Sequence, residues 1–153
     1  MHLFNLKRRT SIRTLVGLAM AGLAQPLQLI AAEWNKSAFD ARTIEAAIKA
    51  IGAGSAKESG QIRVKTPEIA ENGSIVPIEV SSEIPGTQMV YILVDKNPQP
   101  LTASFEFVAE AIPFISTRIK MNESSTVRFI VKAGNEFFAT HREIKVTIGG
   151  CGA

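Results

Sequence analysis

The chain of 153 residues has few of the residue types that build disulfides, metal sites and catalytic centres. It contains one cysteine, Cys151, so no disulfide can form within it, and two histidines, His2 and His141. Beyond residue 32 one cysteine and one histidine remain, whereas a structural zinc site needs four such ligands. The carboxylates are scattered with no spacing that pairs them, and no glycine-rich phosphate loop joins a strand to a helix. We therefore assign no catalytic residue and no metal ligand, and expect no cofactor.

Acidic residues are absent from residues 1–32, which have the three-part layout of a secretory signal. A basic region comes first, an apolar stretch from Leu15 to Ala24 follows, and small residues stand at Ala31 and Ala32. The apolar stretch is shorter than the about 20 residues that span a bilayer, so we expect export and no membrane anchor.

The pair Arg8-Arg9 within the basic region resembles a twin-arginine (Tat) signal, although Ser11 stands where an aromatic residue is usual. We predict that residues 1–32 form a Tat-like signal peptide, cleaved after Ala32 or, alternatively, after Ala24. The protein would then be periplasmic.

Beyond this signal there is no excess of basic charge. The chain has 17 basic and 14 acidic residues, and the signal holds four of the basic ones, which leaves 13 against 14 and a net charge near −1. No basic patch interleaved with aromatic residues occurs in this part, so we expect no binding to nucleic acid.

Residues 33–60 are predicted to form a short N-terminal helix and a linker. Ser37 is a candidate N-cap, with Asp40 three positions later. Four apolar residues then recur at helical spacing: Ile44, Ala47, Ile48 and Ile51. Gly52 is expected to end the helix, and the small residues of 52–60 predict a flexible link.

From Gln61 onward the hydrophobic period changes to two. Alternation of apolar and polar residues marks several candidate strands, at 76–80, 101–107, 115–121, 127–131 and 144–148. Turn signals separate them, at 71–73, 95–100, 121–125 and 133–135. With no helical pattern between them, about seven strands predict an all-β fold, an immunoglobulin-like β-sandwich over residues 61–148 that lacks the antibody disulfide.

Two of the candidate strands carry additional information. The segment 88–94 is apolar on both faces, which is typical of a central strand or of one that a partner covers. Pro77 lacks the backbone donor that a sheet ladder requires, so its strand is expected at an edge.

The last five residues, Gly149 to Ala153, follow the final strand directly. Glycine gives wide backbone freedom without side-chain bulk, and five residues extend about 16 Å. An unpaired cysteine in an oxidising compartment is exposed to oxidation, so Cys151 calls for a function. We predict that residues 149–153 form a flexible arm whose thiol enters a narrow cleft in another protein. His141 is interpreted as a surface strand residue, and as a base for the thiol only if the arm folds back.

A Tat-like signal, a short helix, an all-β domain and the terminal Gly149-Gly150-Cys151-Gly152 together resemble the SoxY family, the sulfur-carrying subunits of the periplasmic Sox system. The segment PEIAENGSIVPIEV (67–80) is also similar to the family's stretch leading into an early strand. Ala153 departs from the second glycine with which family tails commonly end.

This resemblance implies a non-catalytic carrier that binds thiosulfate-derived sulfur covalently at Cys151, with Gly149, Gly150 and Gly152 as its swinging arm. It implies a heterodimer with SoxZ. It also implies service to three enzymes: the c-type cytochrome complex SoxAX, the hydrolase SoxB and a sulfur dehydrogenase. No cofactor is implied other than the sulfur itself.

Two functions of other classes remain open from the residues alone. The first is a redox or copper protein that uses Cys151 with His141 or a methionine. The second is an exported binding module whose terminal thiol forms a disulfide with another chain.

Overall fold

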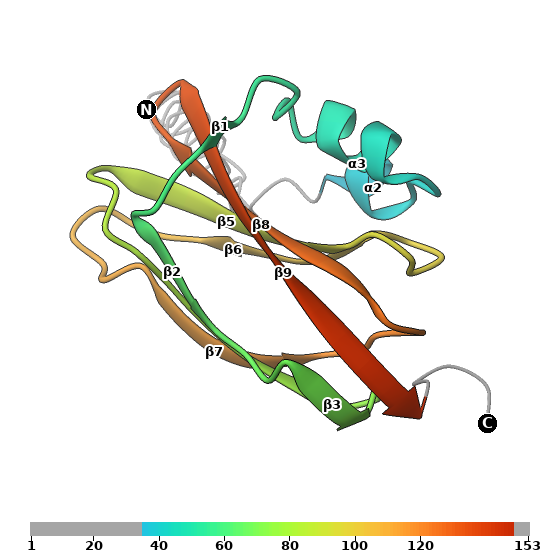
Figure 1. Ribbon diagram of the computed structural model, residues 1–153. Coiled ribbons are helices and arrows are strands. Elements are labelled where there is room, and N and C mark those ends of the chain that lie inside the picture. The colour runs from blue at the N-terminus through green and yellow to red at the C-terminus, as the bar shows by residue number, and fades with distance from the viewer. Residues whose placement is uncertain (1–34, 149–153) are drawn as a thin grey trace, which may run out of the picture. The chain divides into compact units, whose positions relative to one another are not determined.

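The computed structural model describes residues 35–148 (Figure 1). The predicted signal peptide with Arg8 and Arg9 lies outside the described residues, and so does the predicted arm with Cys151. Within the described range no helix has the length and apolar character needed to cross a membrane.

Nine strands in the described range form two sheets. Figure 1 shows how most of these strands are arranged. The strands are β1 (Lys57–Glu58), β2 (Ile62–Lys65), β3 (Ile69–Asn72), β4 (Val76–Ser82), β5 (Thr87–Val94), β6 (Leu101–Glu106), β7 (Phe114–Ile119), β8 (Ser125–Ala133) and β9 (Glu136–Ile148). The larger sheet has the order β1-β9-β8-β5-β6, with β3 also paired to β9, and the smaller one has the order β2-β4-β7. The predicted β-sandwich is confirmed.

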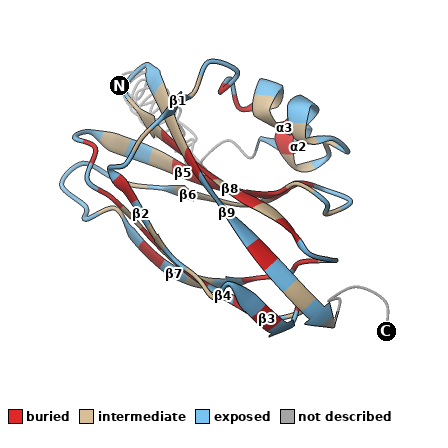
Figure 2. Ribbon diagram, viewed as in Figure 1, coloured by how far each residue is buried: buried red, intermediate tan, exposed pale blue. Residues whose placement is uncertain are grey.

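The core between the sheets follows from the period-two pattern. Strand β4 alternates buried and less buried positions along its length, and Figure 2 shows buried residues on the strands of both sheets. Val76, Ile78 and Val80 of β4 pack in one cluster with Phe129 of β8 and Ile92 of β5. Because alternate residues of a strand point to opposite faces, β4 contributes every second side chain to this layer.

Two short helices, α2 (Lys36–Phe39) and α3 (Ile44–Ala50), stand where one helix was predicted. Asn35 caps α2 and Thr43 caps α3, each accepting a backbone N–H through its side-chain oxygen, at 3.1 and 3.2 Å. The prediction of Ser37 as the N-cap is therefore wrong: its hydroxyl donates instead to Asn35 Oδ1 at 2.8 Å. Gly52 follows α3 with a positive φ of 79°, which is typical of a residue that ends a helix.

The helices cover the outer face of the larger sheet at β5 and β8. Ala38 and Ala47 of the helices are fully buried in a second cluster that includes Leu93, Tyr91 and Ile130. Strand β5 lies between β8 and β6, so the prediction of a central strand is confirmed. Its outer face is covered within the chain, and the alternative of a strand covered by a partner is wrong for β5. Burial, together with the nearby carboxylate of Glu106, raises the pKa of Tyr91.

The segment 52–60 is attached to the sheet and is not the flexible link predicted for it. Ala53 is buried, and β1 pairs with β9 in parallel, Lys57 with Phe138 and Glu58 with Ala139. The segment is ordered because β9, which follows it in the chain only after most of the domain, supplies the hydrogen-bond partners of β1.

The prediction that Pro77 lies on an edge strand is also wrong, since β4 is the central strand of the smaller sheet. The pairing of β4 with β2 begins only at Glu79, whereas its pairing with β7 begins at Val76. Pro77 therefore lies in a part of β4 that has a neighbour on one side only, which is where a missing N–H is tolerated in a sheet.

Candidate functional site

The predicted attachment residue Cys151 and the glycines Gly149, Gly150 and Gly152 follow the last described residue, Ile148, which ends β9. What the structure describes is therefore the root of the arm. We call this region the arm exit: the last residues of β9, the turn 72–75 and the loops 95–100 and 121–125.

The last residues of β9 extend beyond the end of its pairing with β8. The pairing of β9 with β8 stops at Ile144, opposite Ser125. From Lys145 onward β9 pairs in parallel with β3, and the pairing continues to Ile148, opposite Asn72. Thr147 adds a side-chain bond on this side, donating from its hydroxyl to the carbonyl oxygen of Glu71 at 2.8 Å. The edge that faces β3 is thus occupied to the end of the strand.

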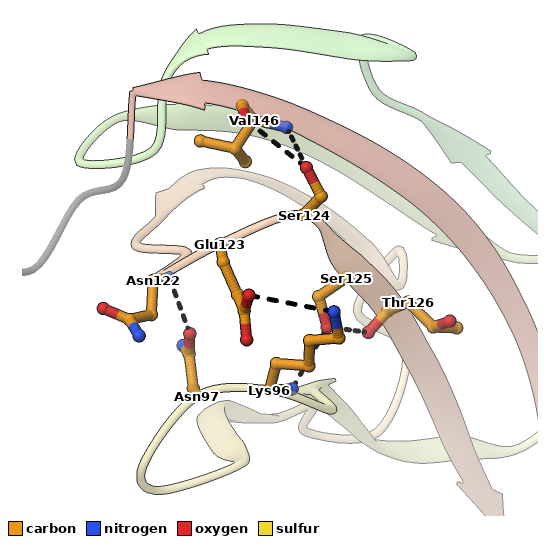
Figure 3. Close-up of polar contacts among 8 residues, drawn as sticks. All are labelled: Lys96, Asn97, Asn122, Glu123, Ser124, Ser125, Thr126 and Val146. Atoms are coloured by element: carbon orange, nitrogen blue, oxygen red, sulfur yellow. Dashed lines mark hydrogen bonds and ion pairs between the residues drawn. The ribbon is translucent and has the colours of Figure 1, made fainter.

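On the edge of β9 that faces β8, a side chain supplies the hydrogen bonds beyond the end of the pairing with β8. The N–H of Val146 donates to Ser124 Oγ at 2.9 Å, and the same hydroxyl lies 3.3 Å from the carbonyl oxygen of Val146, to which it donates (Figure 3). Ser124 therefore replaces one residue of a sheet ladder. As a result, β9 has partners on both edges to within two residues of Ile148.

The two loops beside the strand end are connected by hydrogen bonds. Asn97 Oδ1 accepts from the N–H of Asn122 at 2.9 Å, and Asn97 Nδ2 donates to the carbonyl oxygen of Lys120 at 2.8 Å. The N–H of Lys96 donates to Ser125 Oγ at 3.1 Å, and its ammonium group lies 3.8 Å from Glu123 Oε2 (Figure 3). An exposed ion pair of this kind adds little stability, so the neutral bonds of Asn97 are what fix the loops.

Exposed apolar side chains lie in two separate places. Among residues 35–148 the large ones are Ile69, Ile75, Val108, Ile112 and Phe114. Ile75 is 57% exposed in the turn after β3, and Ile69 is 59% exposed at the start of β3. The other three belong to the segment 108–114, which we call the β6–β7 patch.

The two places lie at opposite ends of the sandwich. Strand β5 is antiparallel to β6 and to β8, and β8 is antiparallel to β9. Strand β9 therefore runs in the direction of β5 and ends where β5 ends, whereas β6 ends where β5 begins. The β6–β7 patch follows the end of β6, so it is remote from the arm exit.

His141 is an exposed residue of β9, as predicted, with Nδ1 3.8 Å from Glu58 Oε1. Opposite it on β8, Arg128 binds both carboxylate oxygens of Asp95 at 2.8 Å, and this hydrogen bonding raises the pKa of Arg128. His141 and Ile148 are seven positions apart, about 23 Å along the strand. A tight turn takes four residues, so the two glycines between Ile148 and Cys151 cannot both reverse the chain and return the thiol to His141. The geometry does not support a base or a copper ligand at this histidine.

The described residues contain no group of three histidine, cysteine, aspartate or glutamate side chains that could hold a metal ion. Of the methionines in the same range, Met121 is fully buried in the core.

Comparison with known proteins assigns the chain to a family. The family model described as "Sulfur oxidation protein SoxY" matches residues 47–151, a range that includes Cys151. The chain belongs to the SoxY family.

A solved structure supports this. The sulfur carrier protein SoxY from Chlorobium limicola f thiosulfatophilum has 36% sequence identity and a TM-score of 0.63, and the match covers 69% of this chain and 97% of that one. A chain from a study of T cell activation by the bacterial superantigen toxic shock syndrome toxin-1 has 15% identity, a TM-score of 0.39 and coverage of 56% and 98%, which is too distant to support an argument. No curated protein sequence matches the chain.

The sequence of this SoxY-family chain did not reveal how the arm exit is built. Ser124, Asn97 and Asn122 stand in segments that the sequence marks only as turns, and polar residues are common in turns. Their partners lie 22 to 25 positions away in the chain, so local pattern carries no signal for them.

Proposed function

We propose that this SoxY-family sulfur carrier acts in the periplasm by binding thiosulfate-derived sulfur covalently to Cys151 and presenting it to partner Sox enzymes. One observation carries the proposal. The family match extends to Cys151, three residues beyond a strand end that is held on both edges. A fixed root and a short glycine arm suit a thiol that is offered to other proteins.

The chemistry of such a carrier follows from the thiolate. Joining the Cys151 thiolate to thiosulfate forms a sulfur–sulfur bond, gives Cys–S–S–SO₃⁻ and releases two electrons, which a c-type cytochrome complex such as SoxAX would accept. Attack of water on the terminal sulfur then releases sulfate and a proton and leaves a persulfide, Cys–S–SH, the step proposed for SoxB. Both adducts belong to the reversible chemistry of thiols.

The chain itself is proposed to be non-catalytic. The only histidine of the described range lies about 23 Å along the strand from Ile148, and the carboxylates of the loops at the arm exit are engaged in ion pairs, Glu123 with Lys96 and Asp95 with Arg128. The domain would provide a docking body and the glycines would provide reach, whereas the partner enzymes would supply acid, base and oxidant.

A heterodimer with SoxZ is part of the proposal. The β6–β7 patch presents Val108, Ile112 and Phe114 with 77%, 83% and 53% of their surface exposed. Contiguous exposed apolar residues commonly mark protein contacts. A constant partner bound there would leave the arm exit, at the other end of the sandwich, free for the enzymes.

Export by the Tat route is proposed from Arg8-Arg9, in a segment with the layout of a secretory signal. The full Sox assignment therefore places the mature chain, its SoxZ partner and the enzymes in one compartment.

Intact mass spectrometry of the mature protein, purified from cells given thiosulfate, tests the proposal. We expect an adduct of one S₂O₃ group or of one sulfur atom on the wild type, and none on Cys151→Ser. The variant should keep the melting temperature, since the strands end at Ile148. A wild type that carries no such adduct and is recovered instead as a disulfide with another chain would refute the carrier function in favour of a thiol-linked binding module.

A further inference from the structure

The length of the arm limits the distance between a partner enzyme and the domain. Two residues separate Ile148 from Cys151, so the Cα of Cys151 lies within about 11 Å of the Cα of Ile148 whatever the arm's conformation. If the reacting atoms of an enzyme are recessed by about 10 Å, the rim of its cleft has to meet the surface around Ile148. The arm exit is therefore an obligatory contact for any enzyme with a recessed site.

The turn 72–75 is the part of this surface adjacent to the strand end. Asn72 pairs with Ile148, and the N–H of Ile75 donates to the carbonyl oxygen of Asn72 at 3.3 Å. Neighbouring strands lie about 5 Å apart, and the ends of such a turn are less than about 7 Å apart, so the Cα atoms of Ile75 and Ile148 are within about 12 Å. The turn is fixed from the other side by Met121, whose N–H donates to the carbonyl oxygen of Gly73 at 2.7 Å.

At the arm exit Ile75 is an exposed apolar side chain, and Ile69 is another on the adjoining strand β3, opposite Lys145. The neighbouring loops present Lys96, Asn97 and Glu123, whose side chains already bind one another or the backbone. The two isoleucines have 57% and 59% of their surface exposed. Burying such a side chain against a partner is favourable, whereas the paired polar groups lose water without a comparable gain.

We propose that Ile75, assisted by Ile69, is the docking contact through which sulfur-processing enzymes hold the carrier while Cys151 is in their active sites. The partner is an enzyme with a recessed site and apolar side chains on the rim of its cleft. This inference rests on the proposed carrier function and adds to it the surface that the enzymes recognise. This contact forms and breaks each time the arm enters and leaves an enzyme. Such a transient interface is small, so a few exposed side chains suit it better than a large apolar face.

The experiment uses the mature chain bound to SoxZ and loaded without any enzyme. Tetrathionate reacts with the Cys151 thiolate to give Cys–S–S–SO₃⁻ and release thiosulfate, so loading tests the thiol alone. Sulfate release by the partner hydrolase is then measured as a function of carrier concentration. The variants are Ile75→Ser and Ile69→Ser, with Ser116→Ala on the exposed face of the smaller sheet as the control, all at a SoxZ concentration that saturates each of them.

We expect Ile75→Ser to lower kcat/KM about fivefold to tenfold, mainly through KM, and Ile69→Ser to lower it less. Loading by tetrathionate and the melting temperature should not change, since both side chains are exposed. Turnover of both variants at the wild-type rate would overturn the docking proposal, and so would an equal loss in Ser116→Ala. If the wild type is loaded but the hydrolase releases no sulfate from it, or if it is not loaded, the carrier function itself fails and the docking proposal with it.

Discussion

Replacing Ser124 by alanine tests whether a side chain holds the root of the arm. The variant removes the acceptor for the N–H of Val146, at 2.9 Å, and the longer bond to its carbonyl oxygen, at 3.3 Å. A neutral hydrogen bond of this kind contributes about 1 kcal/mol net, and water can replace it here because the site is exposed. The edge that faces β3 keeps its pairing, so we expect local opening of the strand end and no loss of the fold.

Amide hydrogen exchange measured by NMR reports this opening residue by residue. A loss of about 1 kcal/mol corresponds to exchange of the Val146 amide about fivefold faster, whereas amides in the centre of β9 should exchange as in the wild type. Ser116→Ala, in the smaller sheet, is the matched control. Unchanged exchange at Val146 in Ser124→Ala would refute the claim that Ser124 acts as a substitute for a ladder residue.

Three further predictions concern the signal, the arm and the partner surface. Arg8→Lys with Arg9→Lys should block export, and an unchanged periplasmic yield would exclude the Tat route. In Gly150→Val, Cys151 should react with small alkylating reagents as in the wild type, whereas the enzymes should process it more slowly. The reason is that a β-branched residue stiffens and widens the arm. Turnover of this variant at the wild-type rate would contradict entry of the arm into a narrow cleft. Ile112→Glu should weaken SoxZ binding at least about tenfold in titration calorimetry, since an unpaired carboxylate would be buried, and unchanged affinity would place the interface elsewhere.

The sequence predicted those parts of the fold that depend on local pattern. Period-two segments became β4, β6, β7 and β8, the segment 88–94 that is apolar on both faces became β5, and the signal at 133–135 became the turn before β9. Only the end of β9 was predicted, because the apolar period is weak before Ile144, where the strand carries Thr140 to Glu143. The strands β1, β2 and β3 were missed because each is short, and β1 and β3 take their hydrogen bonds from β9, most of the domain away in the chain.

The helical layer shows a similar limit. The apolar spacing of Ile44 to Ile51 predicted a helix correctly, but Ser37 was chosen as a cap where Asn35 and Thr43 occupy the caps of two helices. Several residues of this segment are good caps in isolation, so the position of the sheet beneath decides which are used. For the same reason the apolar outer face of β5 was assigned to a partner as one alternative, although the chain's own helices cover it.

The parallel pairing of β3 with β9 has a consequence for the order in which the protein folds. The hydrogen bond between Thr147 and Glu71 closes a loop of 76 positions, and β9 also completes the pairing of β1 and β8. Contacts so distant in the chain form late, because the entropy of closing the loop has to be offset first. Strand β9, which precedes Cys151, is the last of the described strands in the chain, so the larger sheet is complete only after β9 has been synthesised. A chain truncated before β9 would lose the strand that joins β1, β3 and β8 as well as the cysteine, so the arm predicted at 149–153 has a fixed root only where this sheet has closed.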